Sequence, residues 1–132
     1  MEDRNLAHRA PGCDIRRDQG WLRARVGPGL ADEVQECYRA LANACLRDRC
    51  ARILILGVSQ FDAFDHLAAR DALRSLSIAG VPKNFRIAFV ALTPDLIAIY
   101  DTAVIEAERL DMEARRFGSE AEAEIWLARE DS

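Results

Sequence analysis

The chain has 132 residues, of which 50% are hydrophobic and 30% charged, with a net charge of −4 at pH 7. This composition is typical of a single folded domain with its own hydrophobic core, and the acidic balance argues against a nucleic-acid-binding protein. No apolar run approaches the roughly 18 residues of a membrane span, and the charged first residues do not resemble a secretion signal.

The N-terminal part predicts a loose segment, a β-hairpin and a helix. Residues 1–12 are polar and end in a Pro-Gly pair, so we expect them to be disordered or loosely ordered, with the folded domain over residues 13–130. Residues 13–17 form a candidate strand, followed by a turn. Residues 21–26 alternate in part, with arginines on one face and apolar side chains on the other, which predicts a strand with one wet face. Apolar residues at helical spacing predict an amphipathic helix over roughly residues 30–47.

Two strongly apolar stretches, residues 52–58 and 86–92, predict central strands that are buried on both faces, as parallel strands usually are. A second helix is expected between them, over about residues 62–76. A third helix is expected from Thr93-Pro94-Asp95, which supply an N-cap, a first-turn proline and an acid, to about residue 109.

A short strand over residues 112–117 and a helix over about residues 120–130 complete the pattern. Ser119 and Glu122 have the spacing of a capping box at the start of that helix, which is expected to bury Ile125 and either Leu127 or Trp126. The element order is therefore β-β-α-β-α-β-α-β-α. It predicts an α/β fold with one mixed, mostly parallel five-stranded sheet whose first strand is antiparallel.

The cysteines do not suggest a metal site. None of them forms a Cys-x-x-Cys pair and both histidines are far away in sequence, so no metal or cofactor is expected. We interpret them as reduced packing residues of a cytoplasmic protein. They are Cys13, Cys37, Cys45 and Cys50.

Two arginine doublets, Arg16-Arg17 and Arg115-Arg116, lie on candidate strands. Charged side chains on an edge strand prevent it from pairing with another sheet. We interpret both doublets as edge protection of this kind, in preference to a site for a phosphate or an acidic partner.

The element order over roughly residues 13–129 resembles the SpoIIAA-like (STAS) fold of anti-sigma factor antagonists. It is most similar to the bacterial SpoIIAA-like branch that is grouped with STAS and CRAL-TRIO domains. The residues that carry the resemblance are 21–29, 52–58, 86–92 and the strand-then-capped-helix ending at 114–127. The resemblance implies sequential strands wound as a β-α superhelix, and a regulatory or protein-interaction role.

The family's regulatory feature is a phosphorylatable serine, in an Asp-Ser-Ser-Gly-like sequence at the start of the helix after the third strand. Here Asp62 is present, but Ala63 and Phe64 occupy the positions where the serine is expected, and Ser59 comes earlier. The phosphorylation switch is therefore not carried over to this chain.

The candidate binding residues gather at the expected carboxyl ends of the two central strands. Hydroxyls and acids there, near two helix N-termini, could hold an anion or a polar head group. Local capping and helix-dipole roles are the structural alternative for each of them. The candidates are Ser59, Asp62, Asp65, His66, Thr93 and Asp95.

The first functional hypothesis is a non-enzymatic, cytoplasmic protein-interaction module of the SpoIIAA-like type without the phosphoacceptor serine. Its central strands are apolar on both sides, so the N-terminal segment, a crossing helix or a second copy in a homodimer must cover the remaining face. A second hypothesis, from the CRAL-TRIO likeness, is a binder of a small apolar or lipid-like ligand. A third is a small hydrolase or isomerase that uses Asp62, Asp65 and His66, since the histidine titrates near neutral pH.

Overall fold

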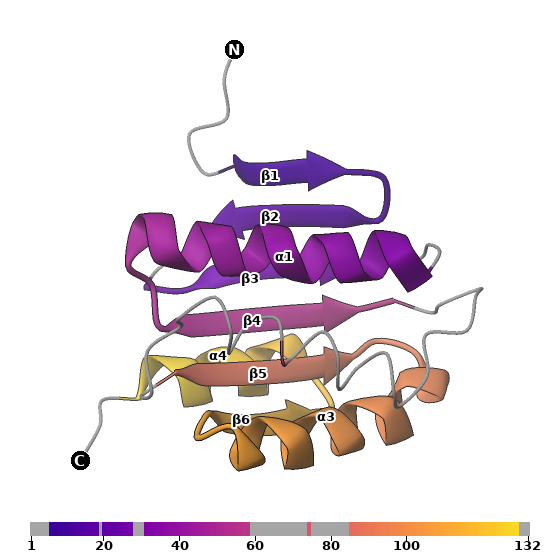
Figure 1. Cartoon of the computed structure of the whole chain (residues 1–132). Helices are drawn as coiled ribbons and strands as arrows, with labels where there is room; N and C mark the ends of the chain where they lie inside the picture. Colours follow the sequence, from indigo (N-terminus) through magenta and orange to yellow (C-terminus); the bar gives the residue numbers. More distant parts are fainter. Residues whose placement is uncertain (1–5, 19, 28–30, 59–73, 75–84, 130–132) are drawn as a thin grey trace.

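One mixed sheet of six strands organises the chain (Figure 1). The computed structural model describes residues 6–18, 20–27, 31–58, 74 and 85–129. The strands lie in the order β1-β2-β3-β4-β5-β6; β1 to β3 are antiparallel neighbours, and β3 to β6 run parallel to one another. Their bounds are Leu6–Ala10 (β1), Cys13–Arg17 (β2), Leu22–Val26 (β3), Arg52–Gly57 (β4), Arg86–Ala91 (β5) and Glu113–Phe117 (β6).

Helices cover the two faces of this sheet unequally. In Figure 1, α1 and α3 lie in front of the sheet and α4 lies behind it. The bounds are Ala31–Asp48 (α1), the 3-10 turn Pro94–Leu96 (η1), Ile97–Arg109 (α3) and Glu120–Ala128 (α4). The long α1 begins with two acids and carries Arg47 in its last turn, as the helix dipole favours.

The predicted α/β class and mixed sheet are confirmed, but the five-strand prediction is wrong. The additional strand is β1, which lies within the segment 1–12 that was expected to be loosely ordered. The predicted helix over residues 62–76 lies outside the described residues, apart from residue 74. In α4, Trp126 and Leu127 are both buried, although the sequence predicted burial of only one of them. The predicted burial of Ile125 is wrong, because its side chain is 69% exposed.

Alternate residues of the central strands pack into two separate hydrophobic cores, one on each face of the sheet. On the α1 and α3 side, Ile53 and Phe89 belong to a cluster that includes Leu41 and Tyr100. On the α4 side, a smaller cluster joins the other face of β4 and β5 to Trp126 and its neighbours. The crossing helix expected to cover the second face is therefore α4. Among the described helices, only α4 lies on this face, and it packs on β4, β5 and β6 rather than on β1 to β3.

Two arginines at the amino ends of β4 and β5 hold the end of α4. Arg52 donates to the carbonyl of Leu127 at 2.5 Å, and Arg86 donates to the carbonyls of Trp126 at 3.2 Å and Arg129 at 2.7 Å. Arg86 is buried, and its guanidinium lies 5.3 Å from the centre of the Trp126 ring. These contacts satisfy carbonyls that a helix end leaves open, so they fix where α4 sits on the sheet.

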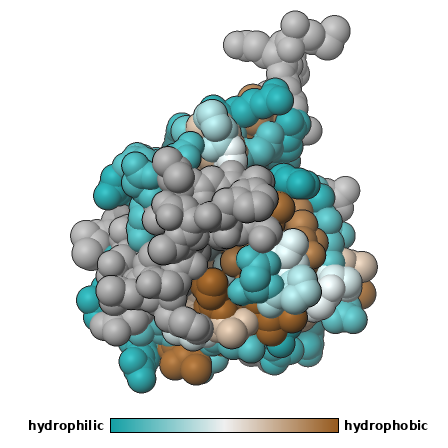
Figure 2. All heavy atoms as spheres, turned by 90° about the vertical axis from the view of Figure 1, so that its right-hand side faces the viewer, coloured by the Kyte–Doolittle hydropathy of each residue, from teal (hydrophilic) through white to brown (hydrophobic). Residues whose placement is uncertain are grey.

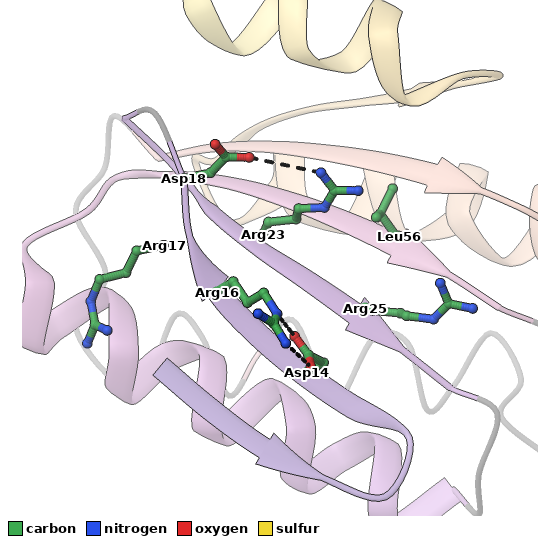
Figure 3. Close-up of a pocket in the computed structure, with 7 residues that line it drawn as sticks. All are labelled: Asp14, Arg16, Arg17, Asp18, Arg23, Arg25 and Leu56. Atoms are coloured by element: carbon green, nitrogen blue, oxygen red, sulfur yellow. Dashed lines mark hydrogen bonds and ion pairs between the residues drawn. The ribbon is translucent and has the colours of Figure 1, made fainter. Parts of the chain in front are cut away.

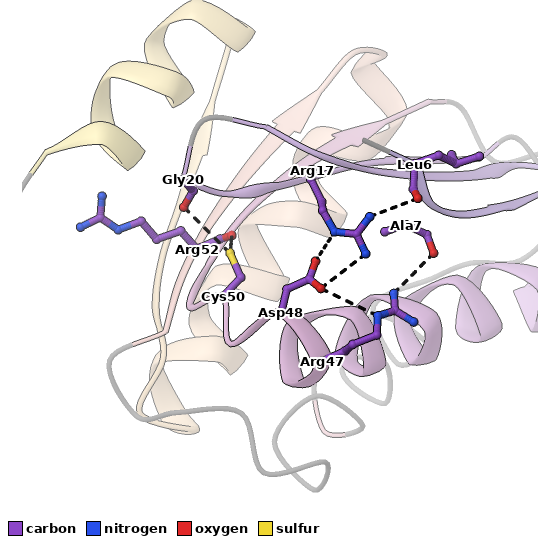
Figure 4. A network of polar contacts seen from close by, with 8 residues as sticks. All are labelled: Leu6, Ala7, Arg17, Gly20, Arg47, Asp48, Cys50 and Arg52. Atoms are coloured by element: carbon purple, nitrogen blue, oxygen red, sulfur yellow. Dashed lines mark hydrogen bonds and ion pairs between the residues drawn. The ribbon is translucent and has the colours of Figure 1, made fainter. Parts of the chain in front are cut away.

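A polar network ties β1 to the last turn of α1 (Figure 4). Arg17 forms an ion pair with Asp48 at 2.6 Å and donates to the carbonyl of Leu6 at 3.2 Å. Arg47 donates to the carbonyl of Ala7 at 3.5 Å. Since β1 has no fully buried side chain, it is held by this network and by its pairing with β2.

The cysteines correct the sequence interpretation in part. Cys13 in β2 and Cys37 in α1 form a disulfide, so the prediction that these two are reduced is wrong. The other two, Cys45 and Cys50, are free thiols. Disulfides form mainly in oxidising compartments. Because Cys13 and Cys37 are bridged, the four cysteines do not support the predicted cytoplasmic location.

The two free thiols are expected to differ sharply in reactivity. Burial raises the pKa of Cys45 to about 12, with smaller contributions from Cys50 and Asp48, whereas Cys50 is half-buried. At pH 8 the Cys45 thiolate is then a fraction on the order of one in ten thousand, so iodoacetamide should label Cys50 first. Peptide mapping by mass spectrometry measures this, with a Cys50→Ser variant as the control. Labelling of Cys45 at the rate of Cys50 in the folded protein would contradict it.

Candidate functional site

The six candidate residues predicted from the sequence fall into two groups. Ser59, Asp62, Asp65 and His66 lie outside the described residues. Thr93 and Asp95 follow β5 at its carboxyl end, as the sequence predicted.

The side chain of Thr93 does not have the capping role expected for it. Thr93 occupies the N-cap position of η1 with an extended backbone, but it makes no side-chain cap hydrogen bond. Its hydroxyl oxygen is buried without a hydrogen-bond partner in the described part of the chain. Asp95 is exposed in the first turn. Figure 2 shows this end of the molecule, where hydrophobic side chains lie at the surface among hydrophilic ones.

The structure points instead to the face of β2 and β3 that α4 leaves open. A hollow of about 450 Å³ lies there, lined by residues of β2, the β2–β3 turn, β3 and β4 (Figure 3). We call this surface, together with Arg9 of the neighbouring β1, the arginine face. The lining residues used below are Asp14 and Arg16 from β2, Arg23 and Arg25 from β3, Asp18 from the turn between them and Leu56 from β4.

The alternation of the two strands produces this surface. In β3, Leu22, Ala24 and Val26 are buried towards α1, which turns the two arginines between them to the other side. In β2 the buried pair Cys13 and Ile15 does the same. The predicted wet face of residues 21–26 is thus confirmed.

Each of two arginines in the hollow has an acidic partner. Arg16 donates to Asp14 at 2.8 Å within β2. Arg23 pairs with Glu120 of α4 and lies 3.9 Å from Glu124 and 4.0 Å from Asp18. These ion pairs neutralise one side of the hollow and connect it to α4.

Arg25 and Arg9 are different. Both are exposed, and neither guanidinium forms an ion pair or hydrogen bond with any residue that the structure describes. Figure 3 shows Arg25 apart from the Arg16–Asp14 pair. A second hollow of about 280 Å³ is lined by Arg9 and Arg25 together with Asp14. Two guanidiniums on either side of Asp14, both without an ion-pair partner among the described residues, create a local positive site on an acidic protein, and such groups bind carboxylates and phosphates.

Sequence reasoning missed this site because it interpreted the doublet Arg16-Arg17 as protection of an edge strand. That interpretation is wrong for both residues, since β2 lies between β1 and β3 and Arg17 points to α1. The available signal was the alternation of charged residues in two adjacent strands. For Arg115-Arg116 the predicted edge position is confirmed, because β6 pairs only with β5 among the described strands.

Compared with protein-family models, curated proteins and solved structures, the chain shows no match. The SpoIIAA-like resemblance therefore stays a prediction. Among the described residues, no helix is long and apolar enough to cross a membrane, and no three metal-ligating side chains of His, Cys, Asp or Glu come together.

Proposed function

We propose that this chain is a non-enzymatic protein-interaction module, as the SpoIIAA-like resemblance implies, and that the arginine face is its partner surface. The observation that carries the proposal is the exposed guanidinium of Arg25, which has no partner among the described residues and lies on a part of the sheet where α4 does not pack. The proposal retains a regulatory role without the phosphoacceptor serine. It moves the binding surface from the strand ends to the open face.

Charge complementarity selects the kind of partner. Arginines without a partner among the described residues, on an otherwise acidic chain, favour an acidic segment of a partner protein, which an open hollow of about 450 Å³ can accommodate in extended form. A nucleic acid fits less well, because the chain has a net charge of −4 whereas nucleic-acid-binding proteins usually present an extended basic surface. This hollow does not favour an apolar ligand, because arginines and acids make up most of its lining.

Charge reversal at Arg25 tests the proposal. A fluorescein-labelled peptide of eight glutamates, titrated in low salt and followed by anisotropy, is expected to bind the wild-type protein. Arg25→Glu should weaken this binding by about tenfold or more, because charge-assisted hydrogen bonds are replaced by repulsion. Added salt should weaken it as well, since the pairing charges are exposed.

The matched control is Arg39→Glu, which makes the same charge change on the exposed side of α1, across the sheet from the arginine face. It should lower the affinity less than threefold, as expected for a remote charge. Equal losses in the two variants would show that net charge alone governs binding. That result, or no peptide binding at all, would overturn the proposed surface.

A further inference from the structure

We propose that the part of the arginine face beside the β1–β2 turn is a subsite for a phosphate dianion, carried by a phosphorylated side chain of the acidic partner segment. This inference rests on the proposed function and deepens it, because it names the group that the surface selects. The feature that carries it is a row of three side chains across three strands.

The sheet register builds this row. Arg9 of β1 is the partner of Asp14 in β2, and Asp14 is in turn the partner of Arg25 in β3. Directly opposed residues on one face of a sheet have Cβ atoms about 5 Å apart, so the two arginines stand roughly 10 Å apart with the aspartate between them. Long side chains reach across that spacing, and both arginines line the same hollow of about 280 Å³.

The aspartate in the middle does not neutralise its two neighbours in the row. Its carboxylate accepts from Arg16, with Nε at 2.8 Å from Oδ1 and Nη2 at 3.3 Å from Oδ2 (Figure 3). Both carboxylate oxygens are thus occupied by one guanidinium of the adjacent row. Among the described residues, Asp14 forms no ion pair with Arg9 or Arg25, so the charges of these two arginines remain available on either side of the Arg16–Asp14 pair.

The charge and the shape of this hollow favour phosphate over carboxylate. A phosphomonoester carries close to two negative charges and three acceptor oxygens, so it can satisfy two guanidiniums at once, whereas a carboxylate has one charge to offer. Gly12 and Gly27 also line this hollow, and neither adds a side chain to it.

Three peptides of one glutamate-rich sequence test the subsite, with serine, phosphoserine or aspartate at the central position. In the full chain, the phosphoserine peptide should bind about tenfold more tightly than the serine peptide. The aspartate peptide should bind with nearly the same affinity as the serine peptide. Arg9→Gln and Arg25→Gln should each reduce the phosphoserine-to-serine ratio to about two or less. Arg39→Gln, on α1, should keep the full ratio.

Inorganic phosphate distinguishes the two sources of the ion. Millimolar phosphate should compete with the phosphoserine peptide and leave the serine peptide bound. If inorganic phosphate binds but phosphorylation of the peptide does not change its affinity, the site binds the free ion, and the proposal of a phosphorylated partner is wrong. If serine and phosphoserine peptides bind equally and phosphate does not compete, the subsite is wrong and the proposed function survives. If neither peptide binds, both fail.

Discussion

Replacing Gly57 by alanine is expected to destabilise the domain by about 3 kcal/mol, because the last residue of β4 lies directly under a buried phenol ring. A Cβ atom at this position would lie 2.5 Å from Cζ and Cε2 of Tyr100 and still closer to its hydroxyl oxygen. The ring has no room to retreat, since it packs 5.0 Å from the ring of Phe89 and hydrogen-bonds to Tyr38. Urea unfolding followed by circular dichroism measures the loss.

The matched control is Gly118→Ala, where nothing lies within 4 Å of the added Cβ, and its cost should stay within about 0.5 kcal/mol. A second variant identifies the cause. In a Tyr100→Leu background the added cost of Gly57→Ala should fall by at least half, because the ring that it meets is gone. Similar destabilisation by both glycine substitutions would show that contact with Tyr100 does not set the cost.

Removing the Cys13–Cys37 disulfide is expected to lower the free energy of unfolding by about 3 kcal/mol in the chain-entropy estimate for a loop of this length. The two cysteines are 24 positions apart and connect β2 to α1. The variant Cys13→Ala/Cys37→Ala should therefore unfold at clearly lower urea concentration than the wild type. Adding dithiothreitol should destabilise the wild type and leave the variant almost unchanged.

Counting thiols checks the premise independently. The unfolded, unreduced chain should expose two thiols, Cys45 and Cys50, and the reduced chain all four cysteines. Cys50→Ser provides a control that alters a half-buried thiol and leaves the bridge intact. Four thiols in the protein prepared without reductant, or equal stability of wild type and the double alanine variant, would contradict the bridge.

The sequence predicted the strands best where hydrophobic patterns are strong. The predicted strands 52–58 and 86–92 correspond closely to β4 and β5. Such continuous apolar runs are typical of strands in a sheet that is buried on both faces. The strand β1 was missed because, apart from Leu6, its side chains are polar or small, and none of the five is fully buried. Pairing with β2 and the contact of Arg17 with Leu6 hold it, and a local pattern does not show such partners.

The candidate site was harder to predict for a related reason. The alternation that exposes Arg23 and Arg25 is visible in the sequence, but which charged face stays open depends on where α4 lies. That position is set by the long-range contacts of Arg52 and Arg86 with the end of α4. The position of Arg25, which has no ion-pair partner among the described residues, also depends on the register of three strands, and the sequence alone does not show that register.

The disulfide has a consequence for recognition as well as for stability. It closes a covalent macrocycle over residues 13–37, and the five charged strand side chains that line the main hollow all belong to this ring. Their strands cannot drift far from α1 even when other parts of the sheet open transiently. The proposed binding surface would thereby be preorganised by a covalent bond, so binding an acidic segment would require less ordering of the receptor.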